Sequence, residues 1–154
     1  MVEKFIESIE SAQKSLQIAD HMTYITFPIV KEKRLLLKIL SNLNTTLLNT
    51  INSVLQYEYY YKRISIYNNA RDNFNTFKTL APKYNINPEQ LKKIIDILTL
   101  AEKHRKSPFE FVKNDKIIIM SEGMQTDTLT LEKIKNFLIE AKDILRKVNA
   151  KVKS

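Results

Sequence analysis

The first apolar positions of the chain recur with the period of a helix. They stand three and four residues apart, at Val2, Phe5, Ile9, Ala12, Leu16 and Ala19. Such spacing is typical of a helix packed nearly parallel against another helix. It predicts a helix over residues 2–24. Pro28 should end it and leave residues 25–30 as a connector, because the residue before a proline is pushed out of the helical region.

A second and longer helix is predicted from about Lys31 to Arg63. One face carries Leu36, Leu40, Leu43, Leu47, Ile51 and Val54, and no glycine or proline interrupts it. A helix of that length spans roughly 48 Å. A compact domain of this chain length has a radius of gyration of only ~15 Å. We therefore expect a molecule that is elongated, kinked or paired with a second copy.

Two further helices follow, each with a recognisable boundary. The first carries Ala70, Phe74, Phe77 and Leu80 on one side and should break or kink at Pro82. The second begins with Asn87 as the cap, Pro88 at the first helical position and Gln90 where a reciprocal capping contact belongs. Its predicted buried stripe is Leu91, Ile94, Ile95, Leu98 and Ala101.

The pattern changes near the C-terminal third. The segment Ser107-Pro108-Phe109-Glu110 repeats the capping pattern over a single turn, which Phe111 should anchor. Residues 116–121 and 125–130 are rich in β-branched side chains and predict two strands. Gly123 lies between them, where a hairpin turn needs a residue that tolerates positive φ. Thr130 then caps a last helix with the core face Ile134, Phe137, Ala141, Leu145 and Val148.

These elements predict one domain over residues 1–154. The fold class is all-α: an elongated bundle of about five helices, opened by a long antiparallel helix hairpin, with one small β-hairpin before the last helix. A chain of 154 residues is long enough to bury its own core. We find no secretory signal and no transmembrane stretch, so we expect a cytoplasmic protein without membrane contact.

Composition removes many kinds of functional site. With one glycine, glycine-rich phosphate loops are excluded, and with no cysteine, so are disulfides, thiolate zinc sites and cysteine nucleophiles. His21 lies about 150° from the seam of the first helix and fits a solvated residue better than a ligand or base. His104 stands near the C-terminus of its predicted helix, where a positive charge interacts favourably with the helix dipole and stabilises the helix. We expect no metal, no cofactor and no catalytic residue.

The net charge of +8 is unevenly placed. Residues 1–60 are neutral, and residues 61–154 carry the entire excess. Such an excess favours a phosphate-bearing partner. Lysines that accumulate at solvent-exposed positions in the sequence would produce the same excess without any ligand. The candidate nucleic-acid-binding residues are Lys103, Arg105, Lys106, Lys113, Lys116, Lys135, Lys142 and Arg146. They form one phosphate-binding surface only if they converge.

Glu58 stands on the apolar face of the second helix with Tyr61 one turn further on, and the two define a candidate buried polar site. A buried carboxylate must be paired, hydrogen-bonded or protonated. It could be a perturbed acid in a tyrosine-lined pocket, a residue beyond the end of the seam, or the partner of a nearby Lys or Arg. Beside it, Tyr57, Tyr59, Tyr60 and Tyr61 precede Lys62 and Arg63, which resembles an aromatic and basic surface for nucleic acid. These tyrosines span more than one face of a helix, so one or two of them should pack inside, and the exposed rings could equally bury against a partner protein.

The opening helical hairpin contains the segment Ser11-Ala12-Gln13-Lys14-Ser15-Leu16-Gln17-Ile18-Ala19-Asp20-His21, and a long leucine-rich helix follows it. This hairpin resembles HEPN-type helical bundles. The resemblance covers the first 60–80 residues and implies a role in RNA processing or in toxin–antitoxin systems. The family's catalytic signature is an Arg followed four to six positions later by a His. The residues at those positions here are Ser15, Leu16 and Gln17 before His21, and Leu98, Thr99 and Leu100 before His104. No ribonuclease residue carries over.

Residues 102–120 are also similar to small archaeal proteins, a resemblance that implies no activity. The leading hypothesis is a non-enzymatic binding module that contacts RNA or a ribonucleoprotein through the basic C-terminal region. The alternative is a structural protein that forms a homodimer or a complex subunit through its long helices.

Overall fold

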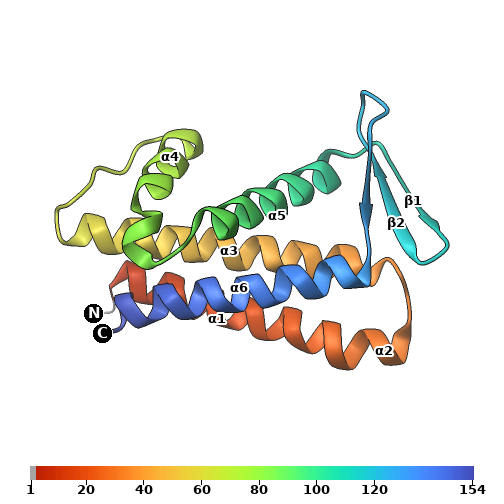
Figure 1. Cartoon of the computed structure of the whole chain (residues 1–154), viewed down its shortest axis with the longest axis horizontal. Helices are drawn as coiled ribbons and strands as arrows, with labels where there is room; N and C mark the ends of the chain where they lie inside the picture. Colours follow the sequence, from red (N-terminus) through yellow and green to blue (C-terminus); the bar gives the residue numbers. More distant parts are fainter. Residues whose placement is uncertain (1–2) are drawn as a thin grey trace.

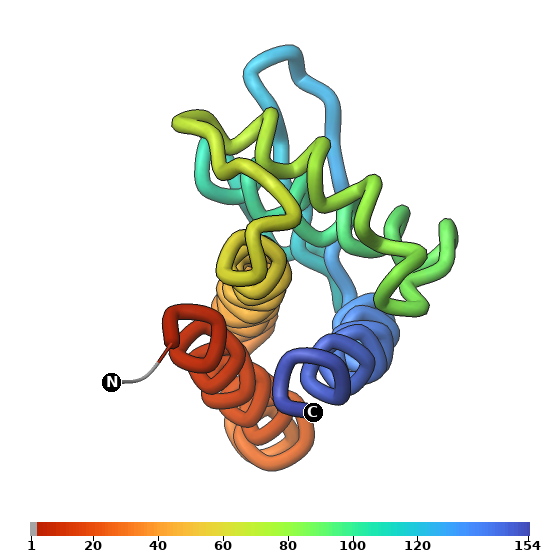
Figure 2. The backbone as a smooth tube through the Cα atoms, turned by 90° about the vertical axis from the view of Figure 1, so that its left-hand side faces the viewer, coloured from red at the N-terminus to blue at the C-terminus, as the bar shows by residue number. Residues whose placement is uncertain are grey.

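Three long helices run side by side along the molecule, and a fourth crosses over them (Figure 1). The structure is a computed structural model that describes residues 3–154. Helices α1 (Lys4–His21), α3 (Leu35–Tyr60) and α6 (Leu131–Val152) pack on one another, and α5 (Pro88–Lys106) lies across α3 and α6 (Figures 1 and 2). A small antiparallel sheet closes one end of the molecule, and the rest of the fold is mainly helical. All of these elements contribute to one hydrophobic core.

Helical structure continues after α1 and includes Pro28, so the predicted connector over residues 25–30 is wrong. After α1 the chain makes a π-helical turn over Met22–Thr26 and a short helix α2 over Phe27–Val30. The Phe27 N–H donates to the Met22 carbonyl, five residues back. Pro28 therefore falls in the first turn of a new helical segment, where its missing N–H has no helical role. Of the predicted seam, Val2 lies outside the described residues, and Phe5, Ile9, Ala12 and Ala19 are buried.

Helix α3 begins and ends a few residues inside the predicted limits. Its 26 residues span ~39 Å, and its whole predicted apolar face is buried, mainly against α1 and α6. Its C-terminus is a Schellman motif. Lys62 has a left-handed φ of 60°, its N–H donates to the Tyr59 carbonyl, and the Arg63 N–H donates to the Glu58 carbonyl. The motif turns the chain so that Arg63 returns towards Glu58.

The predicted boundaries of the next two helices are confirmed. Helix α4 (Ala70–Leu80) is followed by a 3₁₀ turn over Ala81–Tyr84 that contains Pro82. Helix α5 begins with the complete capping box of Asn87 and Gln90 and with Pro88 in its first turn. The buried stripe of α5 differs from the prediction, because it consists of Gln90, Ile94, Ile97, Leu100 and Ala101. Residues on both flanks of this helix are apolar, so its sequence alone does not decide which flank faces the core.

The sheet has three strands instead of two. Strands β1 (Phe109–Lys113), β2 (Lys116–Met120) and β3 (Thr126–Leu129) pair antiparallel in the order β1-β2-β3. The predicted hairpin is the β2–β3 pair. The helical turn predicted over residues 107–110 is wrong, because Ser107 is extended before Pro108 and its hydroxyl donates to the Met120 carbonyl at 2.7 Å. The chain thus enters a strand with Phe111 opposite Ile118.

The turn between β2 and β3 does not use Gly123 as predicted. Met124 has the left-handed φ of 60°, and Gly123 does not have a positive φ. A Cβ added at Gly123 would meet nothing within 4 Å.

We therefore expect Gly123→Ala to raise the free energy of unfolding by about 0.4–1 kcal/mol, because alanine restricts the unfolded chain. Met124→Gly should stabilise by a similar amount, because glycine adopts positive φ without steric cost. Urea denaturation checks both signs, and a destabilised Gly123→Ala would contradict the assigned turn.

Helix α6 follows the sheet at once and agrees with its prediction. The Thr130 hydroxyl accepts a hydrogen bond from the Lys133 N–H and caps the helix. All five residues of the predicted core face are buried. The start of α1 and the end of α6 both lie at the end of the molecule away from the sheet (Figure 1).

Candidate nucleic-acid interface

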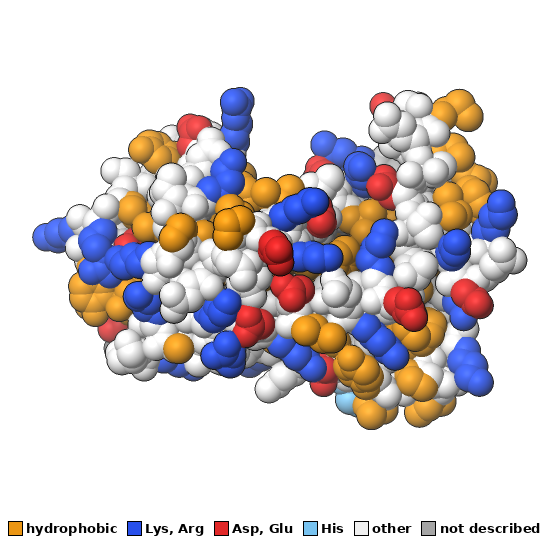
Figure 3. All heavy atoms as spheres, viewed as in Figure 1, with side chains coloured by type: hydrophobic (Ala, Val, Ile, Leu, Met, Phe, Trp, Pro, Cys, Tyr) orange, Lys and Arg blue, Asp and Glu red, His pale blue; other side chains and the backbone are white. Residues whose placement is uncertain are grey.

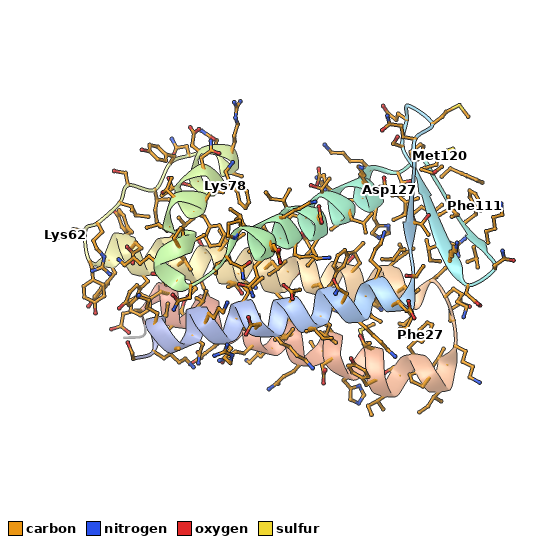
Figure 4. All side chains as sticks on the ribbon, in the orientation of Figure 1. Phe27, Lys62, Lys78, Phe111, Met120 and Asp127 are labelled. Carbon is orange, nitrogen blue, oxygen red and sulfur yellow. The ribbon has the colours of Figure 1, made fainter. Side chains whose placement is uncertain are left out.

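The end of the molecule away from the sheet brings together Glu58, two cations and a tyrosine from three separate segments. Glu58 lies in the last turn of α3 and is only 1% exposed. The Schellman motif carries Arg63 back beside it, and the 3₁₀ turn after α4 contributes Lys83 and Tyr84. Lys62, at the outermost point of this end, marks it in Figure 4. We call Glu58, Arg63, Lys83 and Tyr84 the Glu58 centre.

Four donors converge on the Glu58 carboxylate. Its Oε1 accepts from Arg63 Nε at 3.1 Å and from Lys83 Nζ at 2.7 Å. Its Oε2 accepts from Arg63 Nη2 at 3.2 Å and from Tyr84 Oη at 2.8 Å. A carboxylate offers about four lone-pair positions, so this one is fully occupied. Glu58 joins the end of α3 to the turn after α4, and no lone pair remains with which it could accept a proton from a substrate.

The environment keeps Glu58 ionised. Burial by itself raises the pKa of Glu58, but the hydrogen bonds from Arg63, Lys83 and Tyr84 together outweigh that effect and lower the pKa below its usual 4.5. Burial, and then the neighbouring Glu58 carboxylate, raise the pKa of Tyr84 far above its ordinary value. At neutral pH the centre therefore holds one carboxylate, a neutral tyrosine and two cations, which leaves a net positive charge.

Four tyrosines surround this centre, and we call them the tyrosine cluster: Tyr57, Tyr59, Tyr60 and Tyr61. All but Tyr59 belong to a connected array of rings. Phe5 of α1 meets Tyr57 and Tyr60 edge to face at 5.1 and 5.4 Å between ring centroids, and Tyr61 meets the same two tyrosines at 5.1 and 5.0 Å. The Arg63 guanidinium stands 4.9 Å from the centroid of the Tyr61 ring. Tyr61 thus covers Arg63, and within residues 3–154 its hydroxyl makes no hydrogen bond to Glu58.

A pocket of about 520 Å³ opens beside the tyrosine cluster, between the start of α1 and the end of α3. Apolar rings and two lysines share its wall, whose main residues are Lys4, Phe5, Gln56, Tyr59, Tyr60 and Lys62. The wall thus combines aromatic rings, which can stack on a flat group, with cations, which attract negative charge. Basic side chains also stand out at this end in the space-filling view (Figure 3).

The basic residues predicted from the C-terminal third are placed around the sheet end and along α6. At the end of α5, Lys103 pairs with Asp127 of β3 at 3.0 Å, and both Arg105 and Lys106 pair with Glu102. Lys113 and Lys116 stand opposite each other at the tip of the β1–β2 hairpin. Within residues 3–154, no ion pair joins either of these two lysines to an acid.

The three basic residues of α6 lie apart from those at the end of α5. Lys142 pairs with Asp20 of α1, and Arg146 pairs with Asp143 at 2.6 Å. Lys135 and Lys142 each stand 5.6 Å from the ring centroid of Tyr24. Red acidic side chains are interspersed with the blue ones across the face in Figure 3. Five of the eight predicted residues are thus already paired with an acid of the same chain.

Both histidines are engaged at other places in the fold. His104 Nδ1 lies 2.6 Å from Glu110 Oε2, which links the end of α5 to strand β1. His21 Nδ1 lies 3.5 Å from Thr26 Oγ1 in the π-helical turn. Over the described part of the chain, no group of three or more His, Cys, Asp or Glu residues could hold a metal ion.

Sequence reasoning identified Glu58 and the tyrosine cluster but missed Lys83 and Tyr84. These two residues lie 25 and 26 positions from Glu58, and no periodicity connects the two segments. The only signal was Pro82, which predicted a break in the helix and hence a turn at this point.

Comparisons with known proteins find no match for this chain: no family model fits it, and neither a curated protein nor a solved structure is similar to it. The resemblances to HEPN-type bundles and to small archaeal proteins stay predictions. None of the helices in residues 3–154 has both the length and the apolar character needed to cross a membrane.

Proposed function

We propose that the protein is a non-enzymatic binding module for single-stranded RNA and that the tyrosine cluster with its neighbouring cations is the contact surface. The single observation that carries the proposal is the exposure of three adjacent rings: Tyr59, Tyr60 and Tyr61 are 54%, 54% and 50% exposed. Exposed rings flanked by cations favour unpaired bases, because every base has a face that stacks on an aromatic ring.

The cluster is well suited to stacking because most of its rings are held in place before any ligand arrives. The edge-to-face contacts with Phe5 restrain Tyr57 and Tyr60, and Arg63 restrains Tyr61. A ring that is already ordered loses less conformational entropy when a ligand binds than a free side chain does. Base stacking on such a ring contributes about 1–3 kcal/mol per base.

The cations beside the rings support contacts with phosphates. Arg63 and Lys83 share the single carboxylate of Glu58, and their side chains remain 42% and 39% exposed. Lys151 of α6 adds a third cation, because its Nζ donates to the Lys83 carbonyl at 2.8 Å. Lys62 adds a fourth at the end of α3. One buried carboxylate among four cations leaves excess positive charge for an RNA backbone.

The same geometry favours binding over catalysis. The lone pairs of Glu58 are taken by its four donors, and His104 is held by Glu110 at the opposite end of the molecule. General acid–base chemistry needs a group within hydrogen-bond reach of the substrate proton. The pocket beside the tyrosine cluster is lined by Lys4, Phe5, Gln56, Tyr59, Tyr60, Lys62 and Ile64, and none of these side chains is a carboxylate or a histidine.

RNA binding should depend on the tyrosines and weaken with salt. We expect a fluorescein-labelled oligouridine to bind in an anisotropy titration at 50 mM salt and to bind more weakly at 200 mM. Tyr59→Ala and Tyr60→Ala should each weaken binding by about 5- to 100-fold, which corresponds to the loss of one stacked base. Tyr24→Ala is the matched control, because Tyr24 is also a partly exposed tyrosine beside two lysines but lies far from the cluster.

Charge reversal distinguishes this surface from the one predicted along α6. Lys62→Glu should weaken binding, whereas the pair Lys142→Glu and Arg146→Glu should leave it nearly unchanged. The proposal is wrong if the oligouridine fails to bind at low salt. It is also wrong if the α6 reversals abolish binding while the tyrosine variants bind normally.

A further inference from the structure

The segment that follows α1 exposes a run of apolar side chains to solvent. Residues 22–30 contain no Lys, Arg, Asp, Glu or His. Four large side chains of this run are exposed over 43–77% of their surface: Tyr24, Ile25, Ile29 and Val30. We call these four residues the apolar tip. They lie on the lower edge of the molecule, at the end that carries the sheet (Figure 1). Contiguous exposed apolar residues mark sites of interaction.

The backbone explains why this run faces solvent. The π-helical turn over Met22–Thr26 leads into α2, a helix of only four residues in which Phe27 alone is buried. The helix ends at Lys31, whose left-handed φ of 56° turns the chain towards α3. Because α2 packs on the bundle only through Phe27, the residues on its other sides project outwards. Ile29 is the most exposed of them, at 77%.

The loop that follows the apolar tip is basic. It reads Lys31-Glu32-Lys33-Arg34, which gives it an excess of positive charge. Lys33 pairs with Asp115 at the tip of the β1–β2 hairpin, at 3.5 Å. Within residues 3–154, no ion pair engages Lys31. The apolar tip is thus joined directly to a cation that has no acidic partner.

Helix α6 extends both the apolar and the basic character of this surface. Lys135 and Lys142 each stand 5.6 Å from the ring centroid of Tyr24. Ile139, which is 58% exposed, lies between these lysines along the same face of the helix. Lys142 pairs with Asp20, whereas no ion pair within residues 3–154 engages Lys135. In the space-filling view, hydrophobic side chains gather along this lower edge with basic side chains beside them (Figure 3).

We propose that the apolar tip is a peripheral membrane-binding site that inserts into the surface of an anionic lipid bilayer. Apolar side chains beside lysines match such a surface in charge and polarity, because the apolar groups enter the boundary of the acyl chains while the lysines stay among the anionic headgroups. Tyrosine is favoured at this boundary, since its ring is apolar and its hydroxyl is polar. A fluid bilayer also accommodates side chains that project from an edge, whereas a protein partner would need a matching hollow.

This proposal revises one prediction from the sequence and is independent of the RNA surface. The sequence predicted no membrane contact because it contains no transmembrane stretch. Contact with one leaflet needs only a short apolar segment and nearby cations. The apolar tip lies near the start of α3, and the tyrosine cluster lies at the other end of that helix (Figure 1). Lipid binding and RNA binding can therefore fail separately in experiments.

The first test is co-sedimentation with vesicles. We expect the protein to bind vesicles of phosphatidylcholine and phosphatidylserine, to bind vesicles of phosphatidylcholine alone far more weakly, and to dissociate as salt is raised. Ile29→Glu should weaken binding at least tenfold, because it places a charge among the acyl chains. Lys31→Ala should weaken it about fivefold, because it removes one cation near the headgroups. Leu48→Glu is the matched control, since Leu48 is 51% exposed but stands beside α4.

Three outcomes of this test would overturn the proposal. The first is a failure to bind anionic vesicles at low salt, and the second is equal binding to neutral ones. The third is a loss of vesicle binding in Lys62→Glu as large as that in Lys31→Ala, because the bilayer would then contact the tyrosine cluster. Oligouridine binding by Ile29→Glu should equal that of the wild type, which also shows that the variant is folded.

The second test locates the inserted residues directly. Because the chain has no cysteine, Ile29→Cys can carry a single polarity-sensitive fluorophore. Anionic vesicles should shift its emission to the blue, and lipids with spin-labelled acyl chains should quench it. The same fluorophore on Leu48→Cys should not respond, and an equal response at both positions would contradict insertion through the apolar tip. A dimer in light scattering that Ile29→Glu dissociates would show that a second copy covers the tip, and the proposal would then be wrong.

Discussion

Replacing Glu58 with glutamine should lower the free energy of unfolding by about 2–3 kcal/mol. The carboxylate accepts four hydrogen bonds, three of them from cations, and hydrogen bonds to charged groups are worth more than neutral ones. Glutamine keeps the size of the side chain but loses the charge, and its amide nitrogen cannot accept from the donors that face Oε2 or Oε1. Thermal unfolding followed by circular dichroism should show a melting temperature lower by about 5–10 °C.

Glu102→Gln is the matched control for this prediction. Glu102 also pairs with two cations, and the hydrogen bonds from Arg105 and Lys106 lower its pKa to about 2, but it lies on the surface in water. Exposed ion pairs contribute little because solvent screens them. We therefore expect the melting temperature of Glu102→Gln to stay close to that of the wild type. An equal loss in both variants would mean that burial of Glu58 is not the source of the effect.

The effect of Glu58→Gln should also depend on pH. The folded pKa of Glu58 lies below its usual 4.5, so its contribution to stability is present above that pH and is lost as the pH falls through the folded pKa. The difference in stability between wild type and Glu58→Gln should therefore be constant near neutrality and shrink below about pH 4.5. Urea denaturation at several pH values measures this difference.

Replacing Leu47 with glutamate should abolish the folded state altogether. Leu47 is 1% exposed on the face of α3 that packs against other helices of the same chain. Removing a buried leucine side chain costs about 2–5 kcal/mol, and an unpaired buried charge adds a further large penalty. Because domains of this size are stable by only about 5–15 kcal/mol, circular dichroism should show loss of the cooperative unfolding transition.

The adjacent Leu48→Glu separates burial within the chain from contact between chains. Leu48 is 51% exposed on the same helix, so this variant should fold and melt close to the wild type. A homodimer joined through the leucine face of the long helix would instead make Leu47→Glu a folded monomer. A folded, monomeric Leu47→Glu would contradict the packing of α3 described above.

Local signals in the sequence accounted for the ends of helices and for the last helix. The Asn87–Gln90 capping box and the Thr130 cap are decided by contacts within four residues, so they could be read directly from the chain. The core face of α6 was equally clear because its opposite face is strongly polar. Three predictions failed where a neighbouring segment alters a local preference. Pro28 follows a π-helical turn, Ser107 bonds to strand β2, and Met124 instead of Gly123 has positive φ.

The same division applies to the candidate site. From the sequence alone, Glu58 could be recognised as a carboxylate on an apolar face, and the tyrosines beside Lys62 and Arg63 as an aromatic and basic surface. Sequence could not choose between an exposed and a buried Glu58, because the answer depends on Lys83 and Tyr84. It also could not tell which of the cations in the C-terminal third have acidic partners, since the pairs of Lys103 with Asp127 and Lys142 with Asp20 join separate elements.

By itself, then, the sequence determined a mainly helical protein with a small sheet before its last helix, because periodicity, caps and β-branched runs act over a few residues. Only the tertiary structure decided that four donors occupy Glu58, that the rings of Tyr57 and Tyr61 lie over Arg63, and that a third strand joins the sheet. The physical reason is that hydrogen bonds, ion pairs and buried apolar area depend on distance in space. Lys83 reaches Glu58 from 25 residues away and Lys142 reaches Asp20 across 122 residues, and no local pattern encodes such contacts.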